Sequence, residues 1–117
     1  MSTELHELIE RLRTFADARD WQQFHSPKNL AMALSVEAAE LMEHFQWLNE
    51  QQSQTLSATQ RQQVALEMAD VFLYLLRLAD RLDVDLMASA RRKITLNEQK
   101  YPADQVRGKS GKALQAD

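Results

Sequence analysis

Two pairs of acidic residues share the same spacing along this sequence. Glu37 and Glu40 form the first pair, and Glu67 and Asp70 form the second. Residues three apart on a helix project from the same side, so each pair would present two carboxylates together. Apolar residues flank both pairs, and like charges on an apolar face are costly unless a cation neutralises them. A hard divalent cation with oxygen ligands, such as Mg²⁺, would do so.

The same acids could instead lie on a solvated helix face, because acids three residues apart are common on exposed helices. Apolar neighbours such as Val36 and Met68 favour a partly buried setting. Both pairs also lie near the middle of predicted helices, where the helix dipole gives an acid little help. If the two helices faced each other in a bundle, their carboxylates would offer several oxygens to Mg²⁺. Its remaining sites would go to water and a substrate phosphate.

A second candidate set lies near the end of the last predicted helix and consists of Lys93, Asn97, Lys100 and Tyr101. The first three follow i, i+4, i+7 spacing and therefore share one helix face. Spacing alone favours a simple interpretation, in which the cations offset the dipole at the helix C-terminus. The functional alternative is a phosphate clamp, because two cations, an amide and a phenol suit a polyphosphate.

Aromatic residues form a third candidate set. Three phenylalanines are expected in the core: Phe15, Phe45 and Phe72. Trp21 and His25 fall in a connector between helices, where a core role is less obvious, although His25 could equally be a hydrogen-bonded structural residue. Trp47 at a helix end could stack on a nucleobase. Tyr74 lies one turn after Asp70 and could face the same pocket.

Helical periodicity predicts an all-α chain that positions these residues on four helices. They cover about residues 3–19, 27–48, 57–81 and 83–100. The expected N-caps are Thr3, Ser26, Ser57 and Asp83, and Pro27 suits a first helical position. The Gln-rich segment 49–57 is expected to be a loop. We expect one domain over residues 1–103 and a mobile C-terminal tail over residues 104–117.

Composition excludes several classes of protein. The chain has 117 residues, of which 44% are hydrophobic and 26% charged, as in an ordinary globular domain. A formal net charge of −3 gives no global basic field for a nucleic acid polymer. The absence of cysteine removes disulfides, thiolate zinc sites and cysteine nucleophiles, and it fits a reducing cytoplasm. No apolar run approaches the ~20 residues of a membrane span, and the N-terminus does not read as a signal peptide.

Several motifs occur in a fixed order along the chain. They are Trp21-x-x-Phe24-His25-x-Pro27-x-Asn29, Glu37-x-x-Glu40, Phe45-Gln46-Trp47, Glu67-x-x-Asp70-Val71-x-x-Tyr74 and Lys93-x-x-x-Asn97-x-x-Lys100-Tyr101-Pro102. This ordered set resembles the MazG-like all-α nucleoside triphosphate pyrophosphohydrolases, most closely the dCTP pyrophosphatase branch. The resemblance covers about residues 5–103. It implies a four-helix MazG-like bundle that forms tight homodimers, often paired into homotetramers, with the site built partly from a neighbouring subunit.

The resemblance also implies an activity. A nucleoside triphosphate, above all dCTP or a modified pyrimidine dNTP, would be hydrolysed between its α- and β-phosphates. The products would be a nucleoside monophosphate and pyrophosphate, and the role would be house-cleaning of the cytoplasmic nucleotide pool. Neither a membrane nor a nucleic acid polymer is implied as a partner.

Family position assigns a role to each motif residue. Four acids would hold Mg²⁺, or Mn²⁺ in its place, and one of them would activate the attacking water: Glu37, Glu40, Glu67 and Asp70. The substrate phosphates would be bound by Lys93, Asn97, Lys100 and Tyr101. The nucleoside pocket would be shaped by Trp21, His25, Asn29, Trp47 and Tyr74.

One position departs from the family pattern. Animal dCTP-hydrolysing members carry a histidine where this chain has Leu12, which puts strict cytosine selectivity in doubt. One alternative is therefore a broad-specificity dNTP pyrophosphohydrolase of the same fold. A second alternative, from a different class, is a non-catalytic helical oligomer that binds a nucleotide without cleaving it.

Overall fold

The computed structural model describes residues 3–110, and every regular element in that range is helical. The elements are α1 (Thr3–Ala18), the short 3₁₀ helix η1 (Gln22–Phe24), α2 (Pro27–Glu43), α3 (Glu50–Gln54), α4 (Ala58–Arg81), α5 (Leu86–Lys100) and α6 (Ala103–Val106). Helices α1 to α4 belong to one compact unit, and α5 and α6 belong to another. None of the helices in the described range is long and apolar enough to span a membrane.

Side-chain caps begin most of these helices. The Ser26 hydroxyl accepts a hydrogen bond from the Asn29 amide N–H (3.1 Å), and Pro27 occupies the first turn of α2. Ser57, a predicted N-cap, forms a capping box with Gln60 at the start of α4. Asn49 forms a second capping box with Gln52, so part of the segment expected to be a loop is the helix α3.

Two helices end in the same left-handed turn at an aspartate. After α1, Asp20 has φ 53°, and the N–H of Trp21 donates to the Ala16 carbonyl (2.9 Å). After α4, Asp83 has φ 54°, and the N–H of Val84 donates to the Ala79 carbonyl (2.9 Å). This hydrogen-bond pattern is the Schellman motif, which satisfies carbonyls at a helix end.

The second of these turns corrects one predicted cap. Asp83 was expected to cap the fourth long helix, but it ends α4 instead. Asp85 caps α5 by accepting a hydrogen bond from the Ala88 amide N–H (3.1 Å). At the N-terminus, Thr3 lies within α1 rather than before it. Residues 104–106 of the expected tail belong to α6, residues 111–117 lie outside the described part, and the boundary at residue 103 stays a prediction.

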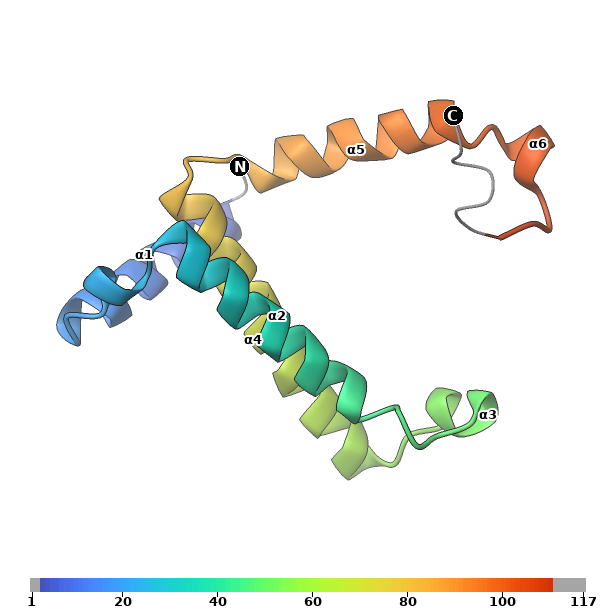
Figure 1. Cartoon of the computed structure of the whole chain (residues 1–117), viewed down its shortest axis with the longest axis horizontal. Helices are drawn as coiled ribbons and strands as arrows, with labels where there is room; N and C mark the ends of the chain where they lie inside the picture. The colour runs from blue at the N-terminus through green and yellow to red at the C-terminus, as the bar shows by residue number, and fades with distance from the viewer. Residues whose placement is uncertain (1–2, 111–117) are drawn as a thin grey trace. The chain divides into compact units, whose positions relative to one another are not determined.

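The first compact unit is built around α4. Helix α2 runs beside α4, and α1 also packs against α4 (Figure 1). The buried apolar side chains come from all three helices: Leu5, Ile9, Ala16, Leu30, Val64, Leu76 and Ala79. Phe45 is half-buried, but Phe15 and Phe72 are 47% and 43% exposed, so their predicted place in the core is wrong for this unit. Within this unit α1 and α2 are the helices that pack mainly against α4. Phe15 on α1 and Phe72 on α4 therefore lie on helix faces that this packing leaves exposed.

Candidate active site

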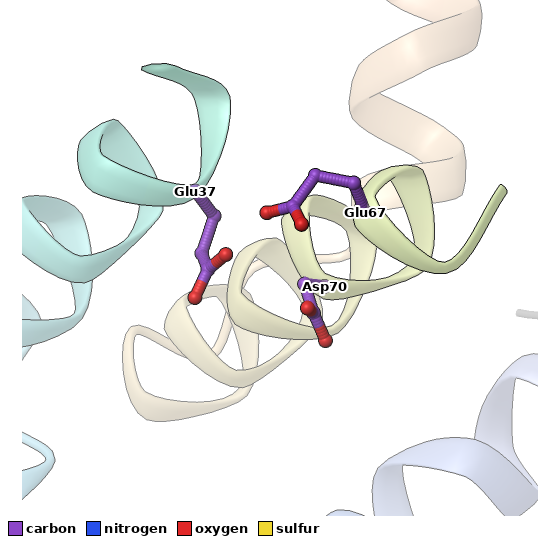
Figure 2. Close-up of side chains that lie close together, drawn as sticks. All are labelled: Glu37, Glu67 and Asp70. Atoms are coloured by element: carbon purple, nitrogen blue, oxygen red, sulfur yellow. The ribbon is translucent and has the colours of Figure 1, made fainter. Parts of the chain in front are cut away.

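Three of the four predicted acids meet between α2 and α4. Glu37 comes from α2, and Glu67 and Asp70 come from successive turns of α4. One carboxylate oxygen from each residue lies within 4.8 Å of the other two. Figure 2 shows Glu37 and Glu67 directed toward one another from their two helices, with Asp70 next to them on α4. The i, i+3 spacing on α4 therefore places two carboxylates opposite a third.

The electrostatics of this cluster are unfavourable without a cation. Within the described residues, Glu37 Oε2 and Glu67 Oε1 are buried and accept no hydrogen bond. The adjoining carboxyl of Glu67, together with burial and the charge of Glu40, raises the pKa of Glu37 to about 7. An unsatisfied buried carboxylate oxygen is costly, and a divalent cation removes both the repulsion and the missing contacts. The cluster therefore has the chemistry of a site for a divalent cation.

Glu40 takes a different place from the other three acids. It is exposed on α2 and its oxygens are not part of the group formed by Glu37, Glu67 and Asp70. It still lies close enough to Glu37 to contribute to the raised pKa of that residue. Glu40 therefore stands at the edge of the cluster, beside Glu37.

A cavity of about 530 Å³ adjoins the acids and is lined by residues of α1, α4 and the connector after α1. Asp70 belongs to both the acidic cluster and the cavity lining. Three of the predicted nucleoside-pocket residues line the cavity: Trp21, His25 and Tyr74. Leu12, the position that departs from the family pattern, lines it as well. The acids and most of the predicted aromatic residues thus belong to one continuous site.

Aromatic contacts hold the connector side of this cavity. The Phe15 and Trp21 rings meet edge to face at 5.7 Å between centroids, and Trp21 meets the His25 ring at 6.3 Å. The Arg19 guanidinium lies 3.7 Å from the Phe15 ring centroid. The Schellman turn at Asp20 sets the backbone direction just before Trp21. Local turn chemistry and ring packing therefore fix the position of the indole.

A buried polar network, which the sequence did not reveal, forms another part of the wall. Arg77 of α4 is 4% exposed. It donates from Nη1 to Asp80 Oδ2 (3.1 Å), from Nη2 to Gln22 Oε1, and from Nε to His25 Nδ1 (3.4 Å). Burial, and then the charges of Arg77 and Arg81, lower the pKa of His25. The sequence signal for Arg77 is its spacing, because it follows Tyr74 by three residues and Asp70 by seven.

Two of the predicted nucleoside-pocket residues do not line the cavity. The Asn29 side chain donates to the Phe24 carbonyl (3.0 Å), so its amide supports the turn before α2. Trp47 is 87% exposed beyond the end of α2. Their predicted contact with a nucleoside stays a prediction.

The predicted phosphate-binding residues lie in the second compact unit. Lys93, Asn97 and Lys100 are exposed along α5, and Tyr101 is half-buried just after it. Lys100 Nζ lies 5.8 Å from the Tyr101 ring centroid. The first three follow i, i+4, i+7 spacing along α5, and their role toward phosphate stays a prediction.

Comparison with known proteins gives concordant matches. A model of the MazG-like family matches residues 32–113. The chain is 42% identical over 109 residues to dCTP pyrophosphatase 1 from Homo sapiens, covering 91% of this chain and 64% of the human protein. The corresponding protein of Mus musculus is 41% identical over the same shares. The chain thus spans slightly less than two thirds of the curated relatives it matches.

A solved structure agrees with these matches. It is the crystal structure of a pyrophosphatase from Archaeoglobus fulgidus, which superposes with a TM-score of 0.69 at 38% sequence identity. The match covers 87% of this chain and 95% of the archaeal one.

Proposed function

This chain belongs to the MazG-like family, and we propose that it is a Mg²⁺-dependent nucleotide pyrophosphohydrolase. The predicted family and the all-helical fold are confirmed. The reaction we propose is cleavage of a nucleoside triphosphate between the α- and β-phosphates, which clears unwanted nucleotides from the cytoplasmic pool. The observation that carries the proposal is the meeting of Glu37, Glu67 and Asp70, with two buried oxygens that accept no hydrogen bond within residues 3–110, beside a cavity of about 530 Å³.

The acids fit a divalent cation, and Glu37, Glu67 and Asp70 would hold it, with Glu40 next to them. A bound Mg²⁺, or Mn²⁺ in its place, supplies charge neutralisation at the phosphates and lowers the pKa of bound water. The half-buried Glu37 and Glu67 would orient the ion or a water, and the exposed Asp70 would face the substrate. Phosphoryl chemistry depends mainly on such positioning and neutralisation, so no side-chain nucleophile is needed.

The substrate we propose is dCTP or a modified pyrimidine dNTP. Support comes from the named activity of the relatives, dCTP pyrophosphatase 1, and from the cavity beside Asp70. Trp21, His25 and Tyr74 would surround the base, whereas Leu12 in the same lining offers no hydrogen bond to it. The alternative, a broad-specificity dNTP pyrophosphohydrolase, is favoured by that apolar position. The phosphates would be bound by Lys93, Asn97, Lys100 and Tyr101 of the second unit.

We also propose that the working enzyme is a homodimer or homotetramer. Several large apolar side chains are more than half exposed on the long helices of the single chain: Met32 (59%), Val36 (56%), Leu66 (65%), Met68 (56%) and Ile94 (60%). Such extensive apolar exposure marks surfaces that a partner covers. Trp47, at 87% exposure, would then contribute to the site of a neighbouring subunit.

The test is pyrophosphate release from a panel of dNTPs, NTPs and 5-modified dCTPs, with Mg²⁺ and with EDTA. Metal-dependent release focused on cytosine nucleotides would support both the reaction and the substrate. Even release across all bases would support the broad-specificity alternative. No release from any nucleotide, together with measurable nucleotide binding, would favour a non-catalytic nucleotide-binding oligomer.

A further inference from the structure

The buried arginine in the cavity wall has no role in the chemistry proposed above. A buried guanidinium is costly unless its donors are matched, and Arg77 uses donors on three partners. Asp80 balances the charge of Arg77, and Gln22 Oε1 accepts a hydrogen bond from its second terminal nitrogen, Nη2. Gln22 is itself oriented by Asp17, to which its amide donates (2.7 Å). This network fixes the direction of the third donor, Nε, toward His25.

The contact from Arg77 to His25 determines which imidazole nitrogen carries a proton. An arginine N–H can only donate, so His25 Nδ1 must present its lone pair. In a neutral imidazole the proton then lies on Nε2. Within residues 3–110, Nε2 makes no hydrogen bond. Because His25 lines the cavity, this N–H is the donor left for a ligand there.

The surroundings of His25 keep the ring neutral. Burial lowers its pKa, and the positive charges of Arg77 and Arg81 on α4 lower it further. On the α1 side, Asp17 pairs with Gln22 rather than with the imidazole. Arg11 of α1 lines the same cavity and adds positive charge. The Asp17 carboxylate, which would favour a charged imidazole, therefore makes no hydrogen bond to His25.

We propose that Arg77 is a positioning residue that holds His25 as a hydrogen-bond donor toward the cavity, so that a bound nucleotide is recognised at a carbonyl oxygen of its base. The identity of the ligand as a nucleotide rests on the proposed function. Cytosine, uracil, thymine and guanine carry such a carbonyl, and adenine does not. The lining agrees with this choice, since Arg11 and His25 supply donors and Asp70 is the one carboxylate among the described residues that line the cavity.

The first test reads the His25 proton directly, without catalysis. In Arg77→Met the side chain keeps an unbranched stem that ends near the position of Nε but loses its donors, and Asp80 keeps both hydrogen bonds from Arg13, so the fold should persist. The matched control is Arg81→Met, which removes one positive charge from the same helix without breaking a hydrogen bond to His25. The measurement is ¹⁵N NMR of the imidazoles at pH 8, with the His25 signals identified by their loss in His25→Gln.

We expect wild type and Arg81→Met to show protonated Nε2 and unprotonated Nδ1. Arg77→Met should show a mixture of the two tautomers and a higher His25 pKa. A wild-type proton on Nδ1, or an Arg77→Met spectrum identical to that of wild type, would overturn the proposal. If Arg77→Met does not fold, Arg77→Lys replaces it, because lysine retains the charge near Asp80 but lacks Nε.

The second test is a double-mutant cycle with Arg77→Met and His25→Ala. Each single variant should lower kcat/KM for dCTP about tenfold, mainly through KM, since one neutral hydrogen bond to the base is lost. The double variant should be no worse than either single one, because both changes remove the same contact. For dATP, which has no base carbonyl, kcat/KM or its inhibition constant should not change.

Additive losses, or an equal loss with dATP, would refute the role of Arg77 in base recognition. If the wild-type protein released no pyrophosphate from any nucleotide, the proposed enzyme activity would fail while the NMR result still decided the link between Arg77 and His25. The same cycle would then be measured as dCTP binding by calorimetry, with the same expected tenfold losses and lack of additivity.

Discussion

Replacing Glu37 by Gln should stabilise the metal-free protein while weakening its response to Mg²⁺. The substitution removes one charge from the cluster with Glu67 and Asp70 and supplies an amide donor near Glu67 Oε1, which has no partner among the described residues. A substitution that stabilises the metal-free fold and weakens metal binding identifies a site in which a bound ligand relieves the repulsion between charges. An ordinary structural acid would not behave this way.

The magnitude follows from the raised pKa of Glu37, about 7 against an ordinary 4.5. At ~1.4 kcal/mol per pH unit, this rise corresponds to roughly 3 kcal/mol against ionisation in the fold. Solvent screens a half-buried carboxylate, so we expect about 1 kcal/mol. A carboxyl whose pKa is higher in the folded state favours folding below pH 4.5, and that contribution disappears as the pH rises through 7. The gain from Glu37→Gln should therefore appear at pH 8 and vanish at pH 4.5.

Thermal unfolding followed by circular dichroism measures this effect. At pH 8 in EDTA the melting temperature of Glu37→Gln should exceed that of wild type by about 4 °C. Addition of 10 mM Mg²⁺ should raise the melting temperature of wild type and have much less effect on the variant. The matched control is Glu43→Gln, which removes an exposed charge from the last turn of α2. A Glu37→Gln variant that is destabilised at pH 8, or that responds to Mg²⁺ as wild type does, would refute the reasoning.

Three further predictions concern other parts of the molecule. Glu67→Gln should lower kcat at least a hundredfold, and Glu40→Gln about tenfold, because Glu40 lies at the edge of the cluster; equal losses in pyrophosphate release would contradict this order. Asp20→Gly should stabilise the fold by about 0.5 kcal/mol in urea unfolding, since φ 53° suits glycine better than aspartate, and a loss of stability would show that the aspartate side chain matters more than the turn. Leu12→His should raise the preference for dCTP over dTTP about fivefold in kcat/KM, because it adds a polar group to the cavity lining; an unchanged ratio would remove position 12 from base recognition.

The acids were predictable from the sequence because their positions depend only on helix periodicity and on which faces are apolar. Glu67 and Asp70 share a face of α4 wherever that helix lies, and the apolar neighbours of Glu37 indicate that it turns inward. The same logic placed Tyr74 beside Asp70. These features are local, and a bundle preserves them.

What the sequence did not reveal depends on contacts between distant segments. In the sequence, Arg77 is one more charged residue on a long helix. Its place in the cavity wall follows from its hydrogen bonds to Gln22 and His25 of the connector, which only the folded chain brings beside it. The predicted cap at Asp83 was wrong for a related reason, since Asp83 and Asp85 are equally good N-cap residues. Only the left-handed turn at Asp83, closed by backbone hydrogen bonds to α4, decides that Asp85 begins α5.

Helix α4 carries two of the four acids and one wall of the cavity, at Glu67, Asp70, Tyr74 and Arg77 in steps of three, four and three residues. At ~1.5 Å of rise per residue, Asp70 and Arg77 are separated by about 10 Å along a single rigid rod. Under the proposed function, substrate selectivity can therefore diverge through substitutions near residues 74–77 while Glu67 and Asp70, the proposed metal ligands, keep their geometry. A single-residue insertion between Asp70 and Tyr74 would instead rotate Tyr74 and Arg77 by about 100° relative to Glu67 and Asp70. The cavity wall would then no longer face the same side as the acids. Evolutionary change in this protein should accordingly proceed by exchange of side chains on α4, with the length of the helix held constant.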